Sequence, residues 1–104
     1  MTTQLLTNML KAACSVTGCS TKQALGRCRK RNLVNARLLF FLLATGHGCR
    51  SIKATWFLQR ERTMAYYLNR QAQNLMSYDL RFQALYYRAK IKYNEINNLN
   101  NAEK

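Results

Sequence analysis

The sequence contains no proline and four glycines in 104 residues, so positions that break helices are rare. It also has no useful length of alternating apolar and polar residues, the pattern of a half-buried strand. We therefore expect an all-α protein. The longest apolar run, 38–44, has seven residues. A helix that crosses a bilayer needs roughly 18, which excludes a membrane anchor.

Acidic residues are scarce: four Asp and Glu stand against seventeen Lys and Arg, which gives a formal net charge of +13. No acid precedes Glu61. Such a surface attracts polyanions, and nucleic acid is the most common polyanionic partner of a small basic intracellular domain. An anionic membrane and a basic surface that only keeps the protein in solution are the alternatives.

The chain is nevertheless apolar enough to fold, because 48% of its residues are hydrophobic. Its length fits one domain, expected over 1–96, and the polar segment 97–104 is expected to be a flexible tail. The N-terminus lacks the charged region of a signal peptide, so we expect a cytoplasmic protein.

Residues for catalysis or metal binding are few. His47 is the single histidine, and the four cysteines include no C-x-x-C pair. A zinc site at His47 and Cys49 would need distant partners. No carboxylate pair has active-site spacing, and Ser51 has no evident base. We expect no enzyme, no cofactor, no small-molecule substrate and reduced thiols.

Apolar spacing and capping residues predict about six helices in a compact bundle. The first helix is expected over about 3–16, and a short second helix is expected after a cap at Ser20 or Thr21. The third runs from a cap at Asn32 to a left-handed Gly46. The fourth is expected over about 49–57, the fifth over about 60–75, and the last from Ser77 or Asp79 to Ile96. The third is apolar on nearly every side, as a buried central helix would be. The fourth and fifth suit a helix-turn-helix, because the fifth has a polar and basic outer face.

The last two predicted helices have clear inward faces. In the fifth, the inward residues are expected to be Met64, Tyr67, Leu68, Ala72 and Leu75. In the last helix, an apolar stripe at helical spacing is expected to face the core and consists of Tyr78, Phe82, Leu85, Ala89, Tyr93 and Ile96.

The basic segment before the third helix carries the most specific pattern. Segment 29–37, RKRNLVNAR, matches the R-K-R-x-I-V-x-A-R form without a gap, and 79–85, DLRFQAL, matches D-x-x-F-x-x-L. In these motifs and in the order of its helices, the chain resembles the C-terminal DNA-binding domain of the bacterial chromosomal replication initiator DnaA. The likeness runs from about Leu10 to Ile96.

The resemblance implies a Trp-repressor-like helix-turn-helix fold that binds double-stranded DNA. It assigns Arg29, or failing it Arg31, to the minor groove, where a narrow A·T-rich groove attracts arginine. The residues assigned to base readout at the start of the recognition helix are Arg60, Glu61, Arg62 and Thr63. The residues expected at the DNA backbone are Lys22, Arg27, Lys30, Arg37, Arg50, Lys53, Tyr66 and Arg70.

The chain departs from that family in three respects. Of the D-H-S/T-T signature only Thr63 is retained, which predicts a different target sequence. Phe57 and Leu58 stand where the family usually has Gly-Gly, so the turn must be built differently or the fourth helix must continue. No G-x-x-x-x-G-K-[ST] motif occurs, so we expect a free-standing, monomeric DNA-binding domain acting in replication initiation or its regulation.

Two other functions suit the same sequence. The first is a protein-interaction module that docks on a replication protein through the aromatic final helix, with Tyr78, Tyr86, Tyr87 and Tyr93. The second is RNA binding, because a basic helical surface with tyrosines can stack single-stranded bases.

Overall fold

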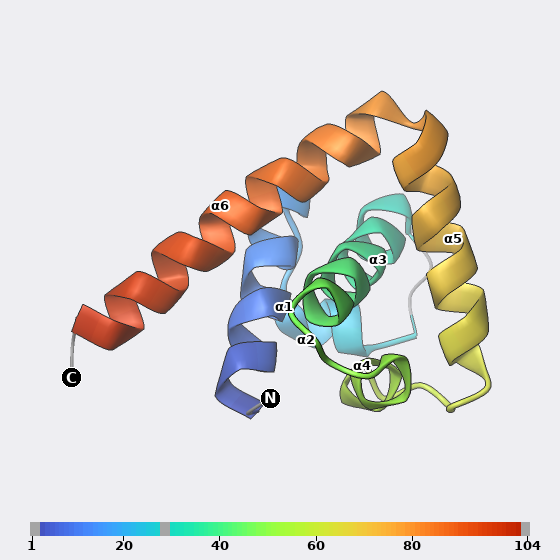
Figure 1. The fold of residues 1–104 in the computed structure, drawn as a ribbon, viewed down its shortest axis with the longest axis horizontal. Coiled ribbons are helices and arrows are strands. Elements are labelled where there is room, and N and C mark those ends of the chain that lie inside the picture. The colour runs from blue at the N-terminus through green and yellow to red at the C-terminus, as the bar shows by residue number, and fades with distance from the viewer. Residues whose placement is uncertain (1–2, 28–29, 103–104) are drawn as a thin grey trace.

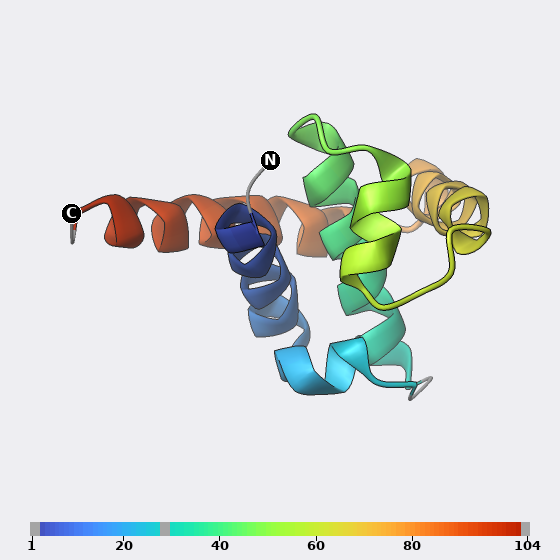
Figure 2. The same ribbon diagram turned by 90° about the horizontal axis from the view of Figure 1, so that it is seen from below.

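The computed structural model describes residues 3–27 and 30–102, and this part of the chain is all-helical. The helices are α1 (Thr3–Thr17), α2 (Thr21–Leu25), α3 (Arg31–Gly46), α4 (Ser51–Phe57), α5 (Met64–Tyr78) and α6 (Leu80–Ala102). α3 lies at the centre, with α1, α5 and α6 around it, while α4 packs on α3 and α5 (Figure 1). Figure 2 shows α6 passing behind α1 and extending beyond it. The prediction of an all-α bundle of about six helices is confirmed.

α3 forms the core because nearly all of its length is apolar and free of helix breakers. Its buried residues include every position from Ala36 to Ala44. α1 adds Met9, Ala12 and Ala13, and α6, which packs on both α1 and α3, adds Phe82. The expectation of a central helix surrounded by protein is therefore correct.

Helix starts follow local capping chemistry. Ser20 Oγ accepts from the backbone N–H of Gln23 at 3.1 Å, and Gln23 Oε1 accepts from the backbone N–H of Ser20 at 3.1 Å, which is a capping box. Asp79 Oδ1 accepts from the N–H of Phe82 and so caps α6. The predicted cap at Asn32 is wrong, because α3 already begins at Arg31. Asn32 Oδ1 accepts from the next residue instead.

Three helices end in the same hydrogen-bond pattern, each with a residue in the left-handed conformation within two positions of the helix end. These residues are Gly18 (φ 78°) after α1, Gly48 (φ 93°) after α3 and Gln59 (φ 61°) after α4. In each case the following N–H bonds back across six residues, as in Cys49 to the Ala44 carbonyl at 2.9 Å. The prediction that Gly46 is left-handed is wrong, since His47 caps α3 and Gly48 takes that conformation.

The α4–α5 turn is built without glycine. Phe57 stacks on Phe40 of α3 with ring centroids 5.3 Å apart, and Leu58 is completely buried. These two side chains anchor the end of α4 in the core, so the left-handed conformation is displaced to Gln59. Residues 59–63 form the connection, and α5 begins at Met64 rather than near Arg60 as predicted.

Two tyrosines expected in the core are exposed, and residues 97–102 of the predicted tail are helical. Tyr67 of α5 and Tyr78 at its end lie on the surface, while Leu68, Ala72, Phe82 and Ala89 are buried as expected. α6 continues to Ala102 instead of ending at Ile96. Residues 97–102 contain no proline or glycine that would stop a helix.

Candidate nucleic-acid interface

The basic segment between α2 and α3 is the first part of the candidate interface. Arg27, Lys30 and Arg31 are exposed. Arg29, the first choice for the minor groove, lies outside the described residues. Arg31 is the first residue of α3, so its backbone position is fixed by the central helix.

Arg37 ties α3 to the end of α2. Its Nε donates to the carbonyl of Ala24 at 2.7 Å, and its Nη2 donates to the carbonyls of Gly26 at 2.9 Å and Gln23 at 3.5 Å. A helix of five residues leaves its last carbonyls without intrahelical hydrogen-bond donors. The buried guanidinium of Arg37 provides the donors that these carbonyls lack. The expectation that Arg37 contacts the DNA backbone is corrected, because this buried side chain holds protein carbonyls.

Arg60 makes a second bridge to the same place. Its Nη1 donates to the Leu58 carbonyl at 3.1 Å, and its Nη2 donates to the Gly26 carbonyl. Residues 26 and 60 are therefore in direct contact although 34 positions separate them. The connection between α4 and α5 is fastened beside the start of the basic segment, which joins the two regions that sequence analysis had assigned to DNA.

The other residues predicted to read bases lie in the connection before α5. Glu61, Arg62 and Thr63 are exposed, and the carbonyls of Glu61 and Arg62 accept from the N–H groups of Met64 and Ala65. They form a turn that enters α5 rather than the first turn of the helix as predicted. Thr63 is the N-cap by position but makes no side-chain cap bond, which leaves its hydroxyl uncommitted to α5.

The outer face of α5 continues from this turn. Tyr66 and Arg70 are exposed, and they follow Thr63 at intervals of three and four, so the three residues share one helix face. The opposite face is buried through Ala65, Leu68 and Ala72. The polar and basic outer face predicted for this helix is present.

Three further cations predicted at the DNA backbone are exposed on other elements. Lys22 lies on α2, Arg50 is the N-cap of α4, and Lys53 is one turn into α4. The structure thus unites the basic segment with the α4–α5 connection and places these three cations on neighbouring elements.

The exposed side of α4 carries apolar side chains that were not predicted to belong to a functional surface. Ile52 and Trp56, one turn apart, are 41% and 62% exposed. α4 instead buries Ala54 and Thr55. A helix of seven residues has too few positions for a clear apolar stripe, so its sequence pattern does not indicate which side faces the core.

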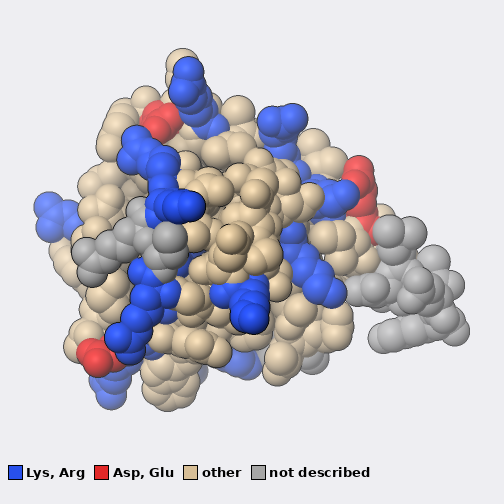
Figure 3. All heavy atoms as spheres, turned by 180° about the vertical axis from the view of Figure 1, so that it is seen from behind, with Lys and Arg blue, Asp and Glu red and all other residues tan. Residues whose placement is uncertain are grey.

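The surface carries a large excess of positive charge. α1 to α4 contain no acidic residue, because the first acid in the sequence is Glu61. Figure 3 shows Lys and Arg side chains spread across the back face, with few acidic atoms among them. Such a surface attracts a polyanion over a distance set by the ionic strength.

The described residues contain neither a cluster of metal-binding side chains nor a helix that could span a membrane. Among them, no group of three or more His, Cys, Asp and Glu side chains is close enough to hold a metal ion. His47 instead lies against Tyr93, with ring centroids 5.1 Å apart. Within residues 3–27 and 30–102, no helix has the length and apolarity to cross a bilayer.

Comparison with protein-family models, with curated proteins and with solved structures finds no significant match to this chain.

Proposed function

We propose that this protein binds double-stranded DNA with a sequence preference, through the basic segment and the α4–α5 unit used as a helix-turn-helix. The observation that carries the proposal is the pair of hydrogen bonds from Arg37 and Arg60 to the Gly26 carbonyl. The Arg60 bond holds the α4–α5 connection beside the basic segment, although the two are far apart in the sequence, and the Arg37 bond ties the same carbonyl to α3. A duplex offers phosphates and groove edges side by side, so a two-part basic surface suits it.

The roles divide by position. Arg62, Thr63 and Glu61 are exposed where the chain enters α5, and we assign base readout to them. Arg60 is committed to two protein carbonyls, so we assign it to positioning the connection.

The other basic side chains set register and affinity. Exposed Arg31 takes the minor-groove role together with Arg29. The proposed phosphate contacts, which carry no sequence information themselves, come from Lys22, Arg27, Lys30, Arg50, Lys53, Tyr66 and Arg70.

The cellular role rests on the resemblance to the initiator's DNA-binding domain. We propose that the chain acts as a cytoplasmic monomer in replication initiation or its regulation, at an origin of the chromosome or of a mobile element. Because the D-H-S/T-T signature is largely replaced, its site differs from the initiator's own.

The decisive experiment is selection of bound sequences from a random duplex pool, followed by titration of the selected duplex at several salt concentrations. We expect an enriched motif flanked by A·T pairs, and log K falling with log salt at about −0.9 per phosphate contacted. Duplex binding that is absent at low salt, or a flat salt dependence, would contradict the proposal. Tighter binding to single-stranded RNA of the same sequence would favour the RNA function instead.

A further inference from the structure

α6 carries a second apolar stripe on the side that faces away from the core. Its members are separated by four, three and four residues and are Leu80, Ala84, Tyr87 and Ile91. Leu80, Tyr87 and Ile91 are 78%, 60% and 61% exposed. The core is already covered by the opposite side of α6, through Phe82 and Ala89. A row of exposed apolar side chains along one helix marks an interaction surface rather than a core contact.

Cations border this stripe on both sides. By helical spacing, Arg81 and Arg88 lie along one edge, and Lys90 lies near the other. All three are exposed, and α6 has no acid before Glu95. The stripe is therefore an apolar strip between positive borders.

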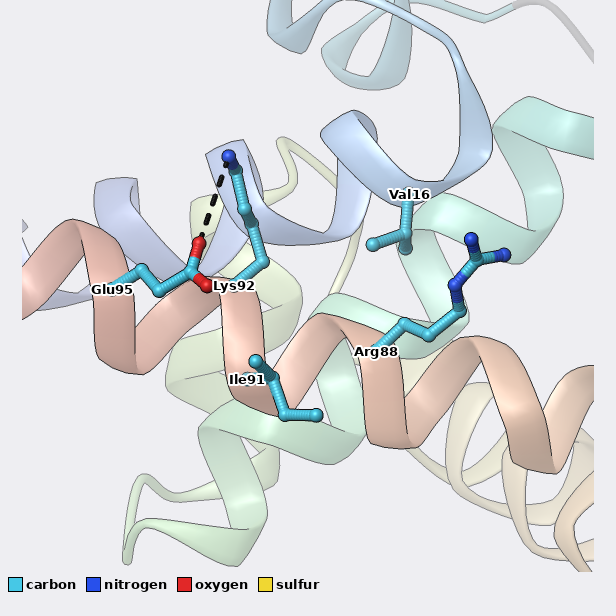
Figure 4. A pocket seen from close by; sticks show the side chains of 5 residues that line it. All are labelled: Val16, Arg88, Ile91, Lys92 and Glu95. Carbon is cyan, nitrogen blue, oxygen red and sulfur yellow. Dashed lines mark ion pairs between the residues drawn. The ribbon is translucent and has the colours of Figure 1, made fainter.

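A shallow hollow continues the stripe toward α1. It has a volume of about 230 Å³ and is lined by Val16 of α1 and by Arg88, Ile91, Lys92 and Glu95 of α6. Figure 4 shows Val16 above the α6 side chains, with the Lys92–Glu95 ion pair of 3.9 Å at one end. Ile91 belongs to both the stripe and the hollow. The hollow can take one apolar side chain of a partner that lies along α6.

We propose that this face of α6 binds an acidic amphipathic helix of a partner protein. The partner's apolar residues would cover the stripe, one of them would enter the hollow, and its carboxylates would face the border cations Arg81, Arg88 and Lys90. A second copy of this chain is a poor occupant, because its α6 would bring the same cations against these. The surface gives the DNA-binding protein a way to recruit a partner.

The test uses a synthetic helical peptide with leucines along one face and glutamates on both sides of them. Its affinity for the full chain is compared between the wild type, Tyr87→Ser/Ile91→Ser and the matched pair Ile52→Ser/Tyr67→Ser, which removes one exposed isoleucine and one exposed tyrosine elsewhere. We expect the α6 variant to lose at least about tenfold in affinity and the control variant to change by less than about twofold. All three proteins should show the same helical circular dichroism, since the substituted side chains are exposed.

A second peptide, with each glutamate replaced by lysine, tests the charge requirement, and it should bind at least about tenfold more weakly. Equal binding of the two peptides, or equal losses from the two variants, would overturn the proposal. So would α6-dependent binding to phosphatidylserine vesicles without peptide binding, or a dimer in sedimentation that Tyr87→Ser/Ile91→Ser dissociates. Duplex binding by the α6 variant is measured separately and should stay unchanged, which keeps this proposal distinct from DNA binding.

Discussion

Arg37 and Arg60 donate to one acceptor, the carbonyl oxygen of Gly26. A carbonyl oxygen has two lone pairs and can accept both bonds. The two guanidinium groups come from the central helix and from the α4–α5 connection, so one backbone atom joins three parts of the chain. The arrangement also brings two like charges together, which costs energy that the accepting carbonyls offset.

Arg37→Ala should lower the free energy of unfolding by about 2–4 kcal/mol, because the Ala24 carbonyl loses the Arg37 donor and the Gly26 carbonyl loses one of its two arginine donors. Arg37→Lys should recover little of this, since an ammonium cannot reproduce the planar fork. Urea unfolding followed by circular dichroism measures both. Arg70→Ala, at an exposed arginine, is the control and should change stability by less than about 0.5 kcal/mol. Similar values for Arg37→Ala and Arg70→Ala would refute the structural role of Arg37.

Arg60→Ala should weaken binding to every duplex by a similar factor, because the connection loses its link to Gly26 while the side chains assigned to base readout remain.

Arg62→Ala should instead relax the preference at one base pair, by about 1–3 kcal/mol. Lys30→Ala, at an exposed cation, should lower affinity uniformly and reduce the salt slope by about 0.9. Competition assays with single-base variants of the selected site distinguish the three patterns. If Arg60→Ala loses its sequence preference at a single base pair, Arg60 reads a base and does not only position the connection.

Much of the fold was accessible from the sequence because the signals were local. The apolar residues on nearly every side of 33–44 identified the central helix, and Ser20 and Asp79 marked two helix starts through ordinary capping chemistry. The start of α5 was missed because a glutamine, not a glycine, takes the left-handed position that ends α4. A sequence pattern assigns that conformation to glycine by default.

The candidate site was less predictable because its key bonds join distant segments. Nothing in the local sequence distinguishes Arg37, which is buried, from Arg31, which is exposed. One signal was present: α2 is too short to satisfy its own carbonyls, and an arginine on the apolar central helix is a natural donor for them. The bond from Arg60 to Gly26 has no counterpart in any local pattern.

Gln59→Gly should raise the free energy of unfolding by about 1 kcal/mol. A glutamine at φ 61° is strained, and glycine adopts this conformation without a Cβ penalty. The side chain is exposed, so little packing is lost. The matched control is Gln73→Gly on the exposed face of α5, which should lower stability by about 1 kcal/mol because it loosens a helix interior. Urea denaturation of both variants should therefore give opposite signs. A loss of stability in Gln59→Gly would show that the glutamine is not strained.

The stability of the protein should fall at alkaline pH through Cys14. Burial raises the pKa of this thiol from 9.0 to about 12, the neighbouring Cys19 adds to the rise, and Arg37 opposes it. Between these two values the unfolded chain releases the Cys14 proton and the folded chain keeps it, so unfolding becomes easier as pH rises. The contribution lost between pH 8 and 10 is up to about 1.4 kcal/mol. Comparison with Cys14→Ala isolates the thiol: unfolding in urea at both pH values should show a shallower decline in the variant. Parallel declines would mean that Cys14 ionises equally in the folded and unfolded states.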